Sequence, residues 1–538
     1  MAWLALLLLA APDFTNVAEE IGLAGVSSGR AVFVDLNGDG RMDVVLDREH
    51  FFLQQENGQF APTANLGEKP GLVLFADYDN DGDQDCFAAY FCEPENKDWV
   101  EKSDKGQKNA VFWNERGTWR RGKEFDLRTS MHSATTLDYD KDGRLDLFLG
   151  EGYIVYGPEL ESWPDHLYRQ GKKGFADVTA QTHLDTARAP GQRGSAKPTY
   201  GVTHADWNND GWQDLFVCTY GRQWNFLWKN LEGKRFEDVA ETTAFDGDTV
   251  RHGRYPDATK TWWKKRFDED REDEQPFRSN GNTFDCAIAD YDNDGDLDCI
   301  LAEITHAWAG DSSDRTSLLV NLGPQKGFAF ERVDAFPRER KGDRWNQGDI
   351  HAAWIDYDND GLLDALIASS DYPDRQELKL YRQKPDHTFE PARTFDWEGA
   401  AQLSVADYDN DGDQDILIGR SLNRLLKEPR EKLGLSCALF RNDVGSKNHW
   451  LQVVCVGKDA NRDGIGCRIE VTTADGVTQL REIRGGHGHA GHNDPYIAHF
   501  GLGTHEKAKK IVVRWPDRGG SITEILDSAV DQRLNVRQ

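Results

Sequence analysis

Short apolar runs, separated by clusters of Asp, Asn and Gly, recur along the first 445 residues. Examples are residues 31–34, 72–76 and 416–418, which are rich in Val, Ile, Leu and Phe. Runs this short, bounded by turn-forming residues, favour strands over helices. The pattern therefore predicts an all-β chain.

A nine-residue acidic pattern occurs seven times between these runs and reads DYDNDGDQD at residues 77–85. Successive copies start 42 to 84 residues apart, so the smallest unit has about 42 residues and longer units carry insertions. Each unit contains about four apolar runs, which is typical of one blade of a β-propeller. The first Asp of each copy is Asp35, Asp77, Asp138, Asp206, Asp290, Asp356 or Asp407.

The last strand of each unit indicates how the repeats close. Six units end in a strand near Phe60, Trp119, Phe175, Phe236, Phe330 or Phe389, and none follows the seventh acidic copy. The missing strand has its match at the N-terminus, where Phe14 to Val17 resembles Phe175 to Val178. We therefore predict a seven-bladed propeller in which the N-terminal strand completes the last blade and removes open edges.

The acidic copies have the composition of a cation cage. Ionised carboxylates this dense repel one another unless a cation neutralises them. Acidic residues at positions 1, 3, 5 and 9 with Gly at position 6 suit Ca²⁺, as in the first half of an EF-hand loop. Gly82 is expected to adopt a positive φ. Position 7 is expected to offer only its backbone carbonyl, because its side chain varies freely among the copies.

We predict up to seven Ca²⁺ ions, one per blade, each tying two strands together; the alternative is a set of acidic turns that bind calcium weakly or not at all. Copies one and four have Asn37 and Asn208 at position 3, so weaker binding is predicted there than in copies two, five and seven. The predicted ligand positions are Asp35, Asn37, Asp39, Arg41, Asp43, Asp77, Asp79, Asp81, Asp83, Asp85, Asp138, Asp140, Asp142, Arg144, Asp146, Asp206, Asn208, Asp210, Trp212, Asp214, Asp290, Asp292, Asp294, Asp296, Asp298, Asp356, Asp358, Asp360, Leu362, Asp364, Asp407, Asp409, Asp411, Asp413 and Asp415.

Charge and hydropathy limit the location and partners. The chain has 64 basic and 93 acidic residues, and its net charge of −29 equals the number of Asp residues in the seven copies. Such a distribution argues against nucleic-acid binding, which needs a basic surface.

Residues 1–11 are apolar and too short to span a bilayer. They predict a signal peptide and a secreted protein; the alternatives are a buried strand or a start codon that was assigned too late. Later runs are too short for a membrane span.

The repeat pattern stops after residue 445, and residues 446–538 are predicted to form a small β domain with strands near 450–456, 467–472, 478–483 and 510–515. Asp459 to Gly464 begins like an acidic copy but has Cys467 at position 9, so no metal is assigned there. Cys455 and Cys467 flank a predicted turn, where a cross-strand disulfide is one alternative and free thiols the other.

Other candidate sites lie in insertions and histidines. The insertions cover residues 93–109, 151–165, 185–198 and 246–282; the last holds a predicted solvated acidic run, 268–274, and two candidate sugar-stacking residues, Trp262 and Trp263. His487, His489, His492 and nearby His499 are interpreted as a surface turn, with a transition-metal site as the alternative. Six residues at or near the starts of inner strands are interpreted as packing or as the lining of a solvated channel, with a ligand site in a central pocket as the alternative: His132, Ser133, His204, Asp285, Asp349 and His351.

The repeats resemble the FG-GAP/VCBS blades that also build integrin α-subunit heads. The tail resembles the ASPIC/UnbV domain in residues 464–468, 481–486, 499–503 and 512–516. The combination is similar to the cartilage acidic protein family and its bacterial relatives, which implies an acidic, secreted, calcium-associated protein. Cys467 departs from the family pattern, in which Ala is more common.

We predict a domain order of signal-peptide-like segment 1–11, propeller 12–445 and ASPIC/UnbV-like domain 446–538. The predicted function is binding of a protein or glycan partner; the alternatives are a carbohydrate-active or biosynthetic enzyme on the same scaffold, or a purely structural surface protein. The sequence lacks the HExxH and phosphate-loop motifs, which favours the binding function.

Overall fold

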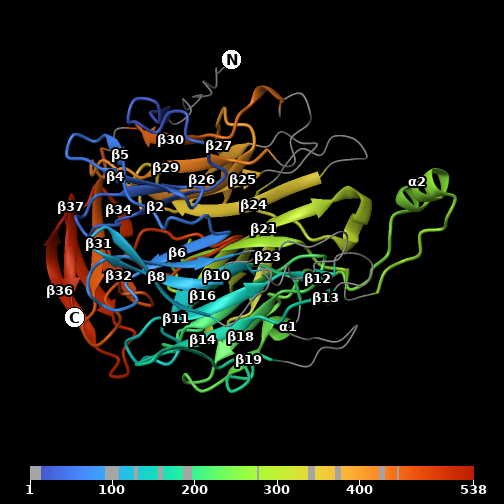
Figure 1. Ribbon diagram of the computed structural model, residues 1–538, viewed down its shortest axis with the longest axis horizontal. Helices are drawn as coiled ribbons and strands as arrows, with labels where there is room; N and C mark the ends of the chain where they lie inside the picture. Colours follow the sequence, from blue (N-terminus) through green and yellow to red (C-terminus); the bar gives the residue numbers. More distant parts are fainter. Residues whose placement is uncertain are drawn as a thin grey trace, which may run out of the picture.

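The computed structural model describes residues 14–90, 108–125, 131–155, 161–185, 197–275, 278–336, 346–369, 377–422, 431–444 and 447–538. Strands dominate these residues, which confirms the all-β prediction (Figure 1). The predicted signal peptide, Cys92 and most of the insertions 93–109 and 185–198 lie outside the described residues.

Each acidic copy belongs to a unit of four antiparallel strands, in the order expected from the apolar runs. The units are β2 (Ala31–Val34), β3 (Asp43–Leu46), β4 (His50–Gln54), β5 (Phe60–Pro62); β6 (Leu72–Ala76), β7 (Asp85–Ala89), β8 (Ala110–Glu115), β9 (Thr118–Glu124); β10 (Met131–Leu137), β11 (Asp146–Glu151), β14 (His166–Gly171), β15 (Gly174–Asp177); β16 (Thr199–Ala205), β17 (Asp214–Thr219), β18 (Phe226–Asn230), β19 (Phe236–Asp238); β20 (Thr283–Ala289), β21 (Asp298–His306), β22 (Ser317–Asn321), β23 (Phe330–Val333); β24 (Asn346–Ile355), β25 (Asp364–Ser369), β26 (Leu378–Gln383), β27 (Phe389–Thr394); and β28 (Ala400–Ala406), β29 (Asp415–Arg420), β30 (Cys437–Asn442), β1 (Phe14–Asn16).

The N-terminal strand β1 completes the last unit, as predicted. It pairs antiparallel with β30, with Phe14 opposite Asn442. The first strand of each unit contacts the first strand of the next from β6 through β28, and β28 contacts β2. The long strands β21 and β24 also pair with each other beyond their own units, at Ile304 and Gly348, which merges two units into one eight-stranded sheet.

The C-terminal residues form two further sheets at one end of the molecule (Figure 1). Four of their strands were predicted to within a few residues; the others were not separated by the pattern. Leu74 and Leu147 of the repeats share one buried core with Leu451 and Phe500 of these sheets. The strands are β31 (His449–Val456), β34 (Ala498–Gly503) and β37 (Gln532–Arg537) in one sheet, and β33 (Thr478–Glu482), β32 (Arg468–Thr472), β35 (Lys507–Arg514) and β36 (Ile522–Ala529) in the other.

The insertion 246–282 contains a helix that the strand-based prediction did not include. Helix α2 (Asp257–Phe267) follows Pro256, buries none of its side chains, and projects at the end of the molecule opposite the C-terminal sheets (Figure 1). No helix within the described residues has the length and apolarity needed to cross a membrane. The smaller elements are α1 (Ala240–Thr243), β12 (Tyr153–Val155), β13 (Glu161–Ser162) and the 3₁₀ turns Ala307–Ser312 and Pro324–Lys326.

Candidate functional site

Every acidic copy forms the loop between the first and second strands of its unit. Its ninth residue is the first residue of the second strand; Asp85, for example, begins β7 and Asp298 begins β21. We number these loops 1 to 7 in chain order. Because the second strand is central in each sheet, its buried start fixes one carboxylate of every loop rigidly against the fold.

Loop 2 illustrates the hydrogen bonding that shapes the loops. The carboxylate of Asp77 accepts the backbone N–H groups of Asp81 and Gly82 at 3.0 and 2.8 Å. The carboxylate of Asp85 accepts the N–H groups of Tyr78 and Asn114 at 3.1 and 2.8 Å. The equivalent first Asp accepts the N–H groups of positions 5 and 6 in each of the other loops.

Two backbone positions in each loop are left-handed. Gly82 has a φ of 108°, as predicted, and the sixth residue of every other loop is likewise a glycine with positive φ. The fourth residue is also left-handed, at 60° for Asn80, which the sequence analysis missed. Asn occupies that position in five loops, and Asn tolerates the left-handed region better than most residues, so this repeated Asn was the available signal.

The crowded carboxylates are poorly suited to bearing charge without a cation. Burial and then the nearby carboxylate of Asp463 raise the pKa of Asp77 to about 8. Burial, reinforced by the charges of Asp79 and Asp77, raises the pKa of Asp85 to about 8. Carboxylate oxygens lie close enough to hold a metal ion in loops 2, 3, 5 and 6, at the triplets Asp77, Asp79, Asp85; Asp138, Asp140, Asp146; Asp290, Asp292, Asp294; and Asp356, Asp358, Asp360. An all-oxygen donor set of this kind fits a hard cation such as Ca²⁺.

Basic side chains already neutralise part of the charge in four loops. In loop 3, Arg169 lies 2.6 Å from carboxylate oxygens of both Asp140 and Asp142. Comparable pairs occur in loops 1, 4 and 6, at Arg41–Asp39, Lys229–Asp210 and Arg382–Asp358. Within the described residues, no basic side chain lies within ion-pair distance of position 3 or 5 in loops 2, 5 and 7. These three loops were predicted to be the strongest cation sites.

The C-terminal domain covers the face on which all seven loops lie. Asp463 accepts the backbone N–H of Asp77 at 2.7 Å, and Gln452 donates to the Asp407 carboxylate at 2.8 Å. The contacts to loops 1 to 7, in order, are Arg533–Gly40, Asp463–Asp77, Arg518–Asp140, Arg468–Asp206, Arg468–Gly295, His499–Asn359 and Gln452–Asp407. The acidic loops are therefore an interface within the chain as well as candidate metal sites.

The predicted surface turn at His487 to His492 is wrong, because this segment is buried between the inner strands. We call residues 484–497 the His loop. An antiparallel bridge between His487 and His492 closes it, and His492 is fully buried. Its residues contact every unit in or directly before its first strand, at Arg30 directly before β2, Phe75 of β6, Thr136 of β10, His204 of β16, Asp285 of β20, His351 of β24 and Gln402 of β28.

The predicted channel residues supply many of these contacts, so the hypothesis of an open ligand channel at these side chains is wrong. Ser133 donates to the Gly488 carbonyl at 2.6 Å, and His204 accepts the N–H of Gly485 at 2.9 Å. His132 packs 5.6 Å from the His489 ring. Asp349 instead accepts a hydrogen bond from Thr316 at 2.6 Å.

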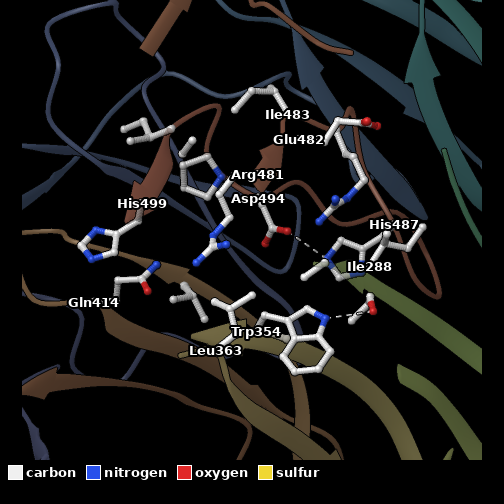
Figure 2. Close-up of a pocket in the computed structure, with 18 of the residues that line it drawn as sticks. Ile288, Trp354, Leu363, Gln414, Arg481, Glu482, Ile483, His487, Asp494 and His499 are labelled. Carbon is white, nitrogen blue, oxygen red and sulfur yellow. Dashed lines mark hydrogen bonds and ion pairs between the residues drawn. The ribbon is translucent and has the colours of Figure 1, made fainter. Parts of the chain in front are cut away.

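Carboxylates flank the imidazoles of the His loop. Asp285 lies 2.8 Å from Nδ1 of His351 and 2.9 Å from Nδ1 of His487. Burial lowers the pKa of His487, but the negative charges of Asp285 and Asp494 outweigh that effect and raise it to about 10. A cavity of about 130 Å³ opens beside His487 and Asp494, and Figure 2 shows the Asp494 carboxylate directed at the His487 ring.

The structure also bears on the predicted disulfide, the acidic run and the aromatic residues of the insertion 246–282. Cys455 and Cys467 are both free buried thiols, so the cross-strand disulfide is absent from this structure. The acidic run 268–274 is not wholly solvated, because Glu274 pairs with Arg222, whose side chain is 2% exposed. Trp262 is 50% exposed and its α2 neighbour Phe267 is 45% exposed, which leaves an aromatic surface on the projecting helix.

Repeated acidic loops on four-stranded units, capped by a distinct β domain, define the class of protein. The FG-GAP-like repeat family matches residues 77–149 and 307–418, and the ASPIC and UnbV family matches residues 457–538. The chain thus consists of FG-GAP-like repeats followed by an ASPIC/UnbV domain. It is homologous to cartilage acidic protein 1.

Two relatives establish the extent of this homology. Mouse cartilage acidic protein 1 is 30% identical over 401 residues, covering 72% of this chain and 51% of the relative. The Xenopus tropicalis protein of the same name is 25% identical over 338 residues, covering 60% of this chain and 43% of the relative. The chain spans about half the length of the curated relatives it matches.

Solved structures with similar backbones are more distant. A crystal structure of BBS1N in complex with ARL6DN gives a TM-score of 0.42 at 9% identity, covering 81% of this chain and 99% of that one. The exotype rhamnogalacturonan lyase YesX gives 0.39 at 12% identity, covering 81% and 75%. Neither likeness assigns an activity to this chain.

Proposed function

We propose that the chain is a secreted, calcium-stabilised adhesive protein, in which a seven-bladed propeller of residues 12–445 and an ASPIC/UnbV domain of residues 446–538 form one rigid body that presents a binding surface to a protein or glycan. The observation that carries the proposal is the coverage of all seven acidic loops by one domain. Because one domain contacts every loop, cations bound in the loops are proposed to stabilise the structure and not to bind and release a ligand.

Two contacts support the closed ring. The His loop reaches the first strand of six units and, in the remaining unit, Arg30 directly before β2; a single loop of 14 residues makes all these contacts most simply when the units surround it. Strand β1 also joins the first described residues to the last repeat unit. Together, the two contacts favour a ring of seven units that is closed both around the His loop and between the first and last repeat units.

Calcium is proposed at the positions predicted in the sequence, with loops 2, 5 and 7 as the strongest sites. Each would supply carboxylates that no basic side chain of the described residues has already paired at positions 3 and 5. The ion would join the loop to the buried start of the second strand, and the C-terminal domain would shield it from water. Apolar residues 1–11 support a secreted location, where calcium is abundant.

Helix α2 is the proposed binding surface. It lies opposite the C-terminal domain, and its Trp262 and Phe267 side chains are half-exposed although they contribute nothing to the core. Aromatic side chains on a rigid scaffold suit both sugar faces and apolar protein anchors. The carbohydrate-active alternative has no specific observation in its favour among the described residues.

The test is a glycan array and an array of extracellular proteins, probed with the full chain in calcium. Trp262→Ala with Phe267→Ala is expected to abolish the strongest signals while leaving the melting temperature nearly unchanged, because exposed substitutions cost about 0.5 kcal/mol or less. Replacing Leu526, which is 62% exposed on β36 of the C-terminal domain, is the matched control. Retention of every signal in the α2 variant would refute this surface.

A further inference from the structure

Three buried histidines meet where the C-terminal domain enters the repeats. His351 lies on β24, and His487 and His492 lie in the His loop. Their ring centroids are 4.8 to 5.1 Å apart. Each offers one ring nitrogen, and these nitrogens all lie within 4.8 Å of one another.

The surrounding oxygens hold the rings in place. Besides its contact with Asp285, His351 donates from Nε2 to the Leu403 carbonyl at 3.0 Å, which leaves Nδ1 to face the cluster. Asp285 lies 2.9 Å from Nδ1 of His487, which leaves Nε2 of that ring for a metal; it also lies 2.8 Å from Nδ1 of His351, a contact that a metal bound at that nitrogen would replace. Metal-bound histidines are usually oriented by carboxylate and carbonyl partners at their other ring nitrogen, as Asp285 does for His487 and the Leu403 carbonyl for His351.

Several nitrogens of this cluster make no hydrogen bond. Both ring nitrogens of His492, a fully buried residue, are without a hydrogen-bond partner, and so is Nε2 of His487. The nearest oxygens belong to Asp494, at 3.3 Å from Nε2 of His487 and 3.6 Å from Nε2 of His492. Buried polar atoms normally form hydrogen bonds, so imidazole nitrogens that make no hydrogen bond and have only these longer ion-pair contacts with Asp494 point to a missing ligand.

We propose that His351, His487 and His492 bind one zinc ion that fastens the His loop to strand β24. Three imidazoles with a nearby carboxylate form a tetrahedral donor set suited to zinc, with Asp494 as the fourth ligand. Zinc–nitrogen bonds of about 2.0–2.1 Å require nitrogens about 3.3 Å apart, so the rings close on the ion by about 1 Å. Imidazole donors disfavour calcium, so this site is distinct from the acidic loops.

The competing occupant of this space is a proton. A protonated His487 between Asp285 and Asp494 would form an ion-pair network without any metal. The two states differ in what they bind, because zinc displaces the proton and needs unprotonated ring nitrogens. A titration with metal therefore separates them directly.

The experiment uses the full chain, stripped with phenanthroline, which removes transition metals, and kept in millimolar calcium so that the acidic loops stay filled. Zinc is then titrated by calorimetry, and cobalt(II) is substituted for its visible spectrum. We expect one zinc per chain, proton release on binding, and the intense absorption of tetrahedral cobalt. Absence of zinc binding, or an octahedral cobalt spectrum, would overturn the proposal without the need for any variant.

Variants locate the site. His492→Gln is expected to abolish the cobalt spectrum, and Asp285→Asn, a positioning change, to weaken zinc binding by about 10–100-fold with the tetrahedral spectrum retained. His505→Gln is the matched control, since His505 lies on the C-terminal domain away from the cluster and pairs with Asp475. Variants are compared only if their metal-free melting temperatures match that of the unchanged chain. Tetrahedral cobalt in the folded His492→Gln variant would also overturn the assignment.

Discussion

The carboxylate at position 5 forms ion pairs in some loops and not in others, depending on which basic side chains lie near it. Asp142 in loop 3 and Asp294 in loop 5 occupy the same position, and each accepts the N–H of the residue two places on, at 3.1 and 2.9 Å. Only Asp142 also pairs with arginines, Arg144 and Arg169. The free charge of Asp294 is therefore available to a cation.

Replacing these two residues tests that distinction. Asp294→Asn is expected to remove about 3 kcal/mol from the calcium-dependent stabilisation, the contribution of one site at a calcium concentration 100 times its Kd. Asp142→Asn is expected to remove much less, because Arg169 already competes for that carboxylate. Urea unfolding with and without calcium measures both. Equal losses in the two variants would contradict the proposed ranking of the loops.

His132 provides a pH-dependent prediction. Burial, and then the positive charge of Arg30, lower its pKa from 6.5 to about 3. Below pH 6.5 the unfolded chain binds a proton at this residue that the folded chain does not, so stability is present above pH 6.5 and is lost as the pH falls toward 3.

In the calcium-loaded protein, His132→Gln is expected to reduce the slope of unfolding free energy against pH by about 1.4 kcal/mol per unit between pH 6 and 4. Denaturant unfolding at several pH values measures that slope. His50→Gln, a substitution of the same kind at an imidazole that is 41% exposed, is the matched control. An unchanged slope in His132→Gln would mean that His132 takes up its proton in the folded state.

At the scale of elements, the His loop depends on close backbone approach. A Cβ atom at Gly485 would lie 1.9 Å from the Thr136 carbonyl oxygen, so any larger residue must push the loop away from β10. Gly485→Ala is expected to cost about 1–3 kcal/mol, the usual cost of overpacking. Thermal unfolding measures the loss.

Gly434→Ala is the matched control, since a Cβ there meets no atom within 4 Å. It should change stability by about 0.5 kcal/mol or less. If Gly485→Ala is equally neutral, the His loop does not dock tightly against the inner strands.

Periodicity and turn residues predicted the repeat strands and the return of β1, because both are encoded locally in short apolar runs. They did not predict the His loop or α2. A run such as Gly485 to Asn493 looks like a surface turn in isolation, and only partners hundreds of residues distant, such as His204 and Asp285, make its burial tolerable. Helix α2 buries no side chain, so it has no apolar face from which the sequence pattern could predict it.

At the scale of the whole molecule, the seven acidic loops and the C-terminal domain form one interface. Without cations, that interface holds buried carboxylates beside one another, as the raised pKa values of Asp77 and Asp85 indicate. One Ca²⁺ in each loop would return two positive charges and offset part of this repulsion beneath the C-terminal domain. Filled loops are therefore expected to stabilise both parts of the chain together.

Thermal unfolding of the full chain in calcium and after chelation tests this claim most directly. We expect chelation to lower the melting temperature by about 10 °C or more, consistent with the loss of several sites, and calcium but not an equal concentration of magnesium to restore it. We also expect the repeats and the C-terminal domain to shift together. An unchanged melting temperature after chelation would contradict the account.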